Sequence, residues 1–136
     1  MKLSQIQIDS AAIEQGAWRD AVGLPGVRFR LRGAGNSDWE ALQEKLHRDL
    51  PPAVKFADRI PAENARAITT ELLVGACLLD WAGIENDDGS AMLFSAAQAR
   101  ELLDDPDFRK LRDSIFATAA KLAEETVADR DAAAKN

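Results

Sequence analysis

The side chains that most often build catalytic and metal sites are scarce in this sequence. Its 136 residues include one cysteine, one histidine and no tyrosine. The single cysteine, Cys77, cannot form an intrachain disulfide, which is typical of a protein from a reducing compartment. Cys77 lies in an apolar segment and His47 at the end of a helical one, so their spacing does not indicate a nucleophile pair. We therefore expect no enzymatic activity and no catalytic residues.

Long hydrophobic runs are also missing, and this excludes further classes of protein. The longest uncharged apolar run, Leu72 to Leu79, is far too short to span a bilayer, and the first residues lack a signal-peptide core. The formal net charge of -6 argues against general nucleic-acid binding. Gly33-Ala34-Gly35 lacks the third glycine and the lysine of phosphate-binding loops. The sequence thus predicts a protein without a cofactor that binds neither membranes nor nucleic acids.

The composition that remains is that of a folded protein. Hydrophobic residues make up 46% and charged residues 29% of the chain, which is ordinary for a single globular domain. The last apolar stripe fades at Ala128, and residues 129–136 have no apolar anchor. We predict one domain over residues 1–128, followed by a flexible tail over residues 129–136.

The first third of the chain has the period of strands and then that of a helix. Between residues 27 and 32, apolar and arginine side chains alternate, which predicts a strand with one apolar and one basic face. A looser alternation over residues 3–8 predicts another strand. Ser37 or Asp38 then caps a helix that runs to about Leu50, where two prolines end it.

The remainder of the chain favours helices. A strongly apolar segment from Pro61 to about Asp80 predicts a central helix. Ser95 and Gln98 have the form of a capping box, and Asp105-Pro106 opens the last helix. An apolar stripe on that helix comprises Phe108, Leu111, Ile115, Ala119 and Leu122. We predict a mainly helical α+β fold, with small N-terminal β-strands in a hairpin packed with about four helices, and a short hairpin at residues 81–94.

The loop Glu85-Asn86-Asp87-Asp88-Gly89 concentrates carboxylates beside a glycine, which raises the question of a metal site. A calcium EF-hand loop places a carboxylate at its first and twelfth positions and glycine at its sixth. With Gly89 at the sixth position, Ile84 would be first and Ser95 twelfth, and neither carries a carboxylate. We interpret the segment as a tight turn, because Gly89 adopts a positive φ without penalty, and we expect no metal.

A series of short motifs resembles the tail assembly chaperones of tailed bacteriophages. The segment Leu78-Leu79-Asp80-Trp81-Ala82-Gly83-Ile84 is followed in order by Asp88-Gly89, Leu93-Phe94-Ser95, Leu102-Leu103 and Asp105-Pro106. This order is similar to the Trp-x-Gly, Asp-Gly, Pro-Phe-Ser, Leu-Leu and Pro pattern of that family, which precedes a long helix. Gly16, Trp18 and the basic strand at residues 28–32 are similar to its N-terminal part.

The resemblance implies partners rather than a reaction. Such chaperones coat the helical tape-measure protein, keep it soluble and recruit tail-tube subunits in the host cytoplasm, and they leave before the virion is complete. We therefore expect a tape-measure partner, a tail-tube partner and self-association. The alternatives are a structural head–tail joining or tail component and, less favoured, a small ligand-binding domain or enzyme. The side chains expected to contact partners are Trp81, Phe94, Phe108 and Phe116, together with Arg28, Arg30 and Arg32 on the strand.

The resemblance also implies a second, longer product. Genes of this family often carry a programmed minus-one frameshift near their end. The residues Ala134-Lys135-Asn136 are compatible with the slip site A-AAA-AAC, which the codons of the gene would reveal. We expect a minor frameshifted form of the protein.

Overall fold

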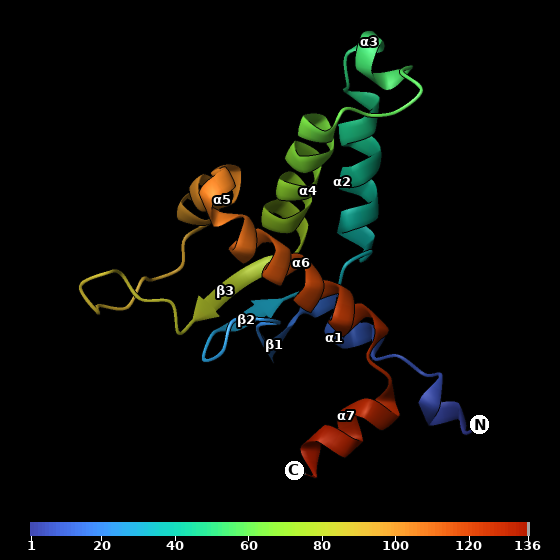
Figure 1. The fold of residues 1–136 in the computed structure, drawn as a ribbon. Helices are drawn as coiled ribbons and strands as arrows, with labels where there is room; N and C mark the ends of the chain where they lie inside the picture. Colours follow the sequence, from blue (N-terminus) through green and yellow to red (C-terminus); the bar gives the residue numbers. More distant parts are fainter. Residues whose placement is uncertain (136) are drawn as a thin grey trace.

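The computed structural model describes residues 1–135, which fold as a small sheet beneath one long helix, with a helical arm on one side (Figure 1). The predicted class is confirmed, because helices predominate around a three-stranded antiparallel sheet. The sheet has the order β1-β2-β3, and α6 packs on β1 and β2. The helices are α1 Ser10–Gln15, α2 Ser37–Arg48, α3 Pro52–Lys55, α4 Ala62–Ala76, α5 Ala96–Asp104, α6 Arg109–Glu124 and α7 Val127–Ala134, with 3-10 helices η1 Leu3–Gln5 and η2 Pro106–Phe108.

The sheet consists of β1 Ala17–Asp20, β2 Arg28–Leu31 and β3 Leu78–Ala82. The predicted alternation in β2 is confirmed, because Phe29 and Leu31 are fully buried whereas Arg28 and Arg30 are exposed. β1 and β2 form the predicted N-terminal hairpin. Its neighbour β3 passes so close that a Cβ atom on Gly83 would lie 2.1 Å from the carbonyl oxygen of Gly26. Glycine is therefore required there for close backbone approach.

The N-terminal segment is helical, so the prediction of a strand over residues 3–8 is wrong. Leu3–Gln5 form η1, and only Ile8 makes an isolated β-bridge, with Thr126. The Asp9 side chain accepts a hydrogen bond from the Ala12 N–H and caps α1. The physical reason for the error is that Leu3 and Ile6 are exposed, so their spacing does not reflect a buried strand face.

The arm consists of α2 and α4, which pack side by side, with the short α3 at the tip (Figure 1). Asn36 caps α2, one residue before the predicted caps, by accepting the Trp39 N–H at 2.9 Å. The predicted helix from Pro61 to about Asp80 ends early, because α4 stops at Ala76 and β3 begins at Leu78. Apolar residues continue through both elements, so no change of hydrophobicity marks this boundary.

Helices from the second half of the chain pack on one face of the sheet. Ser95 caps α5 as predicted, since its hydroxyl accepts the Gln98 N–H, but within residues 1–135 the Gln98 side chain does not complete the predicted capping box. Of the predicted stripe, Ile115, Ala119 and Leu122 on α6 are buried in the core and Leu111 is partly buried against it, whereas Phe108 lies in η2 and is exposed. The sheet contributes Phe29 and Leu31 to the same core. This face of the sheet is therefore closed by helices.

The last described segment is a helix rather than irregular chain. α7 begins with a capping box in which the Thr126 hydroxyl accepts the Asp129 N–H and the Asp129 carboxylate accepts the Thr126 N–H. It lies against the N-terminal segment, because Arg130 donates to the Asp9 carboxylate at 2.8 Å and the Val127 N–H donates to the Gln7 carbonyl. Residues 129–134 are thus helical, and the predicted flexibility of residues 129–136 stays a prediction. Asn136 lies outside the described residues.

Candidate protein-binding surfaces

One face of the sheet is not covered by the helices that form the core. Strand register places Trp18 beside Arg30 and Arg30 beside Asp80, on the face opposite Phe29 and Leu31. Arg28 lies next along β2 on the same face. We call the residues Trp18, Arg28, Arg30 and Asp80 the open sheet face.

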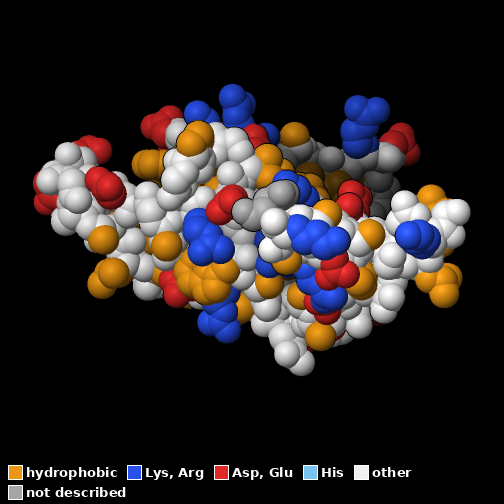
Figure 2. All heavy atoms as spheres, turned by 90° about the horizontal axis from the view of Figure 1, so that it is seen from below, with side chains coloured by type: hydrophobic (Ala, Val, Ile, Leu, Met, Phe, Trp, Pro, Cys, Tyr) orange, Lys and Arg blue, Asp and Glu red, His pale blue; other side chains and the backbone are white. Residues whose placement is uncertain are grey.

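Arg28 and Trp18 on the open sheet face contact each other. The Arg28 guanidinium carbon lies 5.8 Å from the centre of the Trp18 ring, at the distance of a cation–π contact. The Arg28 Nε atom also lies 3.3 Å from Asp20. Arg30 forms no ion pair within residues 1–135. Figure 2 shows basic and hydrophobic side chains next to one another on the face seen from below.

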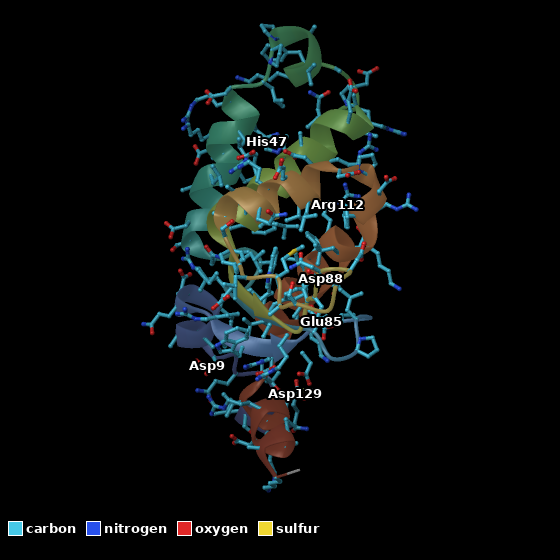
Figure 3. All side chains as sticks on the ribbon, turned by 90° about the vertical axis from the view of Figure 1, so that its left-hand side faces the viewer. Asp9, His47, Glu85, Asp88, Arg112 and Asp129 are labelled. Atoms are coloured by element: carbon cyan, nitrogen blue, oxygen red, sulfur yellow. The ribbon has the colours of Figure 1, made fainter. Side chains whose placement is uncertain are left out.

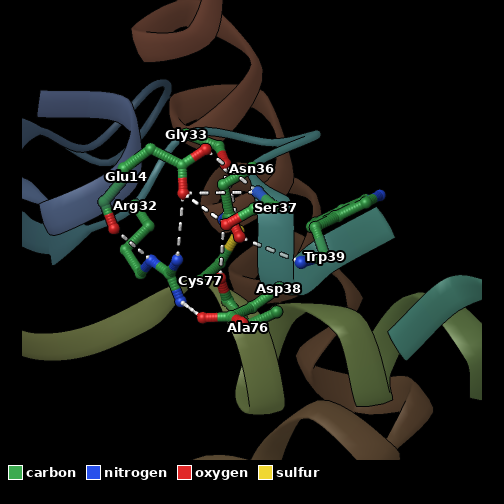
Figure 4. Close-up of polar contacts among 9 residues, drawn as sticks. All are labelled: Glu14, Arg32, Gly33, Asn36, Ser37, Asp38, Trp39, Ala76 and Cys77. Atoms are coloured by element: carbon green, nitrogen blue, oxygen red, sulfur yellow. Dashed lines mark hydrogen bonds and ion pairs between the residues drawn. The ribbon is translucent and has the colours of Figure 1, made fainter. Parts of the chain in front are cut away.

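Arg32, the third arginine of the predicted basic strand, holds the fold together instead. Its Nε atom donates to the Glu14 carbonyl at 2.6 Å, and its Nη1 atom donates to Asp38 at 2.7 Å (Figure 4). The Ser37 hydroxyl and N–H also donate to the Glu14 carboxylate. These Ser37 bonds, followed by the charge of Arg32, hold the pKa of Glu14 below its usual value. Arg32 therefore joins α1 to the start of α2. Its guanidinium is not available to bind a partner protein, whereas those of Arg28 and Arg30 are.

Trp81 and Phe94 lie together at the edge of the core. Their rings are 5.1 Å apart and meet edge to face. The Trp81 Nε1–H donates to the Met92 carbonyl at 2.8 Å, and only 5% of Trp81 is exposed. The structure thus gives Trp81 a packing role, and its predicted contact with a partner would require this pair to open.

Phe108 and Phe116 keep far more of their surface in solvent. They are 43% and 42% exposed, although Ile115 beside Phe116 is completely buried. The Phe116 ring packs 6.3 Å from the ring of Trp39 on α2, centre to centre. Phe116 therefore lies on the outer surface at the junction of α6 and the arm, where a partner can reach it.

The acidic loop after β3 is a turn. Glu85 and Ala91 form a β-bridge, and the Met92 N–H donates to the Ile84 carbonyl, so a short hairpin exists within the predicted range of residues 81–94. Gly89 has a φ of 87°. The Asp88 carboxylate accepts from both the hydroxyl and the N–H of Ser90, and these bonds lower its pKa. Among residues 1–135, no group of His, Cys, Asp and Glu side chains is placed to hold a metal ion.

Cys77 and His47 lie at opposite ends of the arm. His47 is in the last turn of α2, near the tip, whereas Cys77 follows α4 at the base. The 12 residues of α2 separate the two ends by roughly 18 Å at 1.5 Å per residue. Burial raises the pKa of the Cys77 thiol to about 12. Figure 3 shows His47 far from the acidic residues Asp9 and Asp129. The two side chains therefore cannot act as a nucleophile and its base.

The structure also exposes apolar side chains that sequence reasoning did not select. Leu3, Phe56 and Leu93 are 82%, 78% and 83% exposed. They lie in η1, at the tip of the arm and after the acidic turn, in separate parts of the molecule. The sequence offers no signal for them, because their exposure depends on how the elements pack. No helix within residues 1–135 is long and apolar enough to cross a membrane.

Comparison with known proteins gives one match. The family described as YdaY prophage protein matches over residues 34–136, which is most of the chain. No curated protein and no solved structure matches the sequence or the fold significantly. The matched range includes the arm, β3 and the helices from α5 to α7, and excludes β1 and β2.

Proposed function

Because the chain belongs to the YdaY prophage protein family, we propose that it is a tail assembly chaperone, which binds the helical tape-measure protein of a phage or prophage. In this proposal it keeps that protein soluble in the host cytoplasm and helps to recruit tail-tube subunits. It has no catalytic role. Membership of a prophage family supports the general setting, and the tail motifs of the sequence support the specific role.

The observation that carries the proposal is the open sheet face. Tryptophan and arginine are enriched in protein interfaces, where they supply apolar area and charge-assisted hydrogen bonds. Here Trp18 and Arg28 lie in contact, and Arg30 lies on the same face without an ion-pair partner within residues 1–135. Such a surface fits a partner that offers both apolar and acidic side chains. Phe116 provides a second, mainly apolar contact at the junction of α6 and α2.

Co-expression tests the role directly. The protein should increase the soluble yield of the tape-measure protein encoded nearby, and the two should co-purify. A variant with Trp18→Ala, Arg28→Ala and Arg30→Ala should lose co-purification while keeping its fold. The matched control is Lys45→Ala with Arg59→Ala, which removes exposed basic side chains from the arm instead. The chaperone role is wrong if the tape-measure protein is equally soluble alone.

A structural component of the phage tail is the alternative, and mass spectrometry of purified virions separates the two. A chaperone should be absent from the finished particle, whereas a joining or tail protein should persist in it. A thermal-shift screen with metals and nucleotides tests the remaining alternative of a small enzyme or ligand-binding domain. Under our proposal no metal raises the melting temperature, and a nucleotide raises it no more than inorganic phosphate at the same concentration does.

The minor frameshifted product is part of the same proposal. Sequencing the gene tests its first step, since AAG at codon 135 would remove the slip site. Mass spectrometry of cells that carry the intact locus tests the second step. Detection of only the 136-residue product would contradict the frameshift and leave the chaperone proposal standing.

A further inference from the structure

A cavity of about 460 Å³ lies between α4 and α6. Thr70 on α4 and Leu103 on α5 line it and are almost completely buried, so they form its inner part. Side chains from the start of α4, from η2 and from the start of α6 complete the lining. The cavity is thus assembled from three helices that are separated in sequence.

Three arginines line this cavity. Arg66 comes from α4, whereas Arg109 and Arg112 lie one turn apart on α6. The chain as a whole carries a formal net charge of -6, so three guanidinium groups around one cavity are an unusual local concentration of positive charge. Glu63 and Asp104 also line the cavity, so its lining side chains carry a formal net charge of +1.

Carboxylates of the protein do not neutralise these arginines. Neither Glu63 nor Asp104 comes within the 4.0 Å of an ion pair with an arginine. In residues 1–135 the one ion pair that these three arginines form is that of Arg112 with Asp113, at 3.8 Å. That distance is too long for a charge-assisted hydrogen bond.

Arg112 is the most constrained of the three. Only 13% of its side chain is exposed, yet its guanidinium donates to no protein acceptor within residues 1–135. No buried side-chain nitrogen in that range lacks a hydrogen-bond partner. The nitrogens of Arg112 must therefore reach open space, and the cavity is the space that Arg112 lines. Figure 3 shows Arg112 near the start of α6.

We propose that this cavity is a binding site for an oxyanion, held by Arg66, Arg109 and Arg112. The guanidinium group donates two parallel hydrogen bonds and so matches the oxygen pairs of carboxylate and phosphate. The anion is either free phosphate or the carboxylate of an acidic side chain on a partner protein. The site is distinct from the open sheet face and does not depend on the proposed chaperone role.

Binding should be measured by calorimetry and thermal shift with two probes on the full chain. The first probe is inorganic phosphate, compared with chloride at equal ionic strength. The second is a short blocked peptide of glutamates. Binding of phosphate alone identifies the free anion as the source, and stronger binding of the peptide identifies a carboxylate.

Variants locate the site. Arg112→Gln should weaken binding of the probe by about tenfold, the expected effect of losing one charge-assisted contact. Arg66→Gln and Arg109→Gln change exposed residues and should weaken it without loss of fold. The control is Arg59→Gln, which removes an exposed arginine outside the cavity and should leave binding unchanged.

A gain of affinity gives the sharpest test, because misfolding cannot produce it. Glu63→Gln with Asp104→Asn removes the two carboxylates of the cavity, so binding of the probe should tighten. The proposal is overturned if neither probe binds the wild-type chain. It is equally overturned if the three arginine variants, all folded by circular dichroism, bind as the wild type does.

Discussion

Asn36 satisfies three backbone groups at once, from a position that is 1% exposed. Its amide nitrogen donates to the carbonyls of Gly33 and Ala76, both at 2.8 Å, and its oxygen accepts the Trp39 N–H (Figure 4). One side chain therefore caps α2 and fixes the end of α4 beside it. A residue with either an acceptor or a donor alone cannot do both.

Replacing Asn36 should consequently be costly. Asn36→Ala removes the side-chain donor to the Ala76 carbonyl and the cap of α2, so we expect a loss of about 2–4 kcal/mol in unfolding free energy. Asn36→Asp should cost more, because a carboxylate would face the carbonyls of Gly33 and Ala76. Urea unfolding followed by circular dichroism measures both. Gln43→Ala, an exposed substitution on the same helix, is the comparison, and an Asn36→Asp variant as stable as the wild type would contradict the assignment.

Trp81 is the second residue whose contacts predict a large effect. Trp81→Ala should cost on the order of 3–5 kcal/mol, because it removes a buried ring and its contact with Phe94. Trp81→Phe should cost less, since it keeps most of the ring and loses the bond to the Met92 carbonyl. Thermal and urea unfolding test this ranking. Near-neutral stability with loss of partner binding would instead place Trp81 in a binding surface.

Among the elements, α7 depends on carboxylates that are paired in the folded protein. Hydrogen bonds from Ala12 and then Arg130 lower the pKa of Asp9, and bonds from Thr126 lower that of Asp129. A carboxyl with a lowered folded pKa stabilises the fold above its usual pKa and loses that contribution as the pH falls through the lowered value.

The contact of α7 with the N-terminal segment should therefore be complete at neutral pH and weaken below about pH 4. Amide chemical shifts of residues 127–134 during an acid titration measure this change. In Asp9→Asn with Asp129→Asn, the contact should already be weakened at neutral pH. Shifts that stay constant to the acid limit in the wild type would contradict a role for these carboxylates.

In contrast to the carboxylates that hold α7, those of the acidic turn between β3 and α5 should contribute little to the stability of the fold. Asp87→Ala with Asp88→Ala should leave the fold intact, because both side chains are exposed and only a turn contact to Ser90 is lost. Calcium should not raise the melting temperature of either protein. A calcium-dependent rise of several degrees that the double variant abolishes would establish a metal site and refute the turn.

An element could be predicted from the sequence where a few neighbouring residues determine its structure. β2 was predictable, because its alternation and the turn before it lie within a few residues. The end of α4 was not, because the apolar residues continue through Cys77 and Leu78, which are both buried, and an uninterrupted apolar run fits a helix and a strand alike. Among the candidate residues, the alternating pattern placed Arg32 on the same strand face as Arg28. In the structure Arg32 instead forms ion pairs with Glu14 and Asp38. The arginine cavity depends on the packing of α4 against α6, which no local pattern contains.

At the scale of the whole molecule, exposed apolar side chains are distributed over several surfaces. Leu3, Phe56, Leu93 and Phe116 lie on different elements. A protein that coats a rod needs repeated contacts, both with the rod and between its own copies. The distribution is compatible with both kinds of contact.

We accordingly expect self-association into dimers or larger open assemblies. Multi-angle light scattering over a wide range of protein concentration measures it. Phe56→Ser at the tip of the arm and Phe116→Ser on α6 should each shift the assembly toward the monomer if its side chain lies in the contact. A strict monomer at high concentration would contradict this part of the proposal.

The bridge between Ile8 and Thr126 has a consequence for the order in which the protein can be built. The ribosome makes β2 well before Ile115 and Ala119 of α6, which belong to the same apolar core. Until then Phe29 has no partner from α6, and the N-terminal segment has no α7 to lie against. The core side of the sheet therefore lacks its α6 neighbours until α6 itself has been made. During its synthesis the chain therefore passes through a state in which part of this apolar core is exposed.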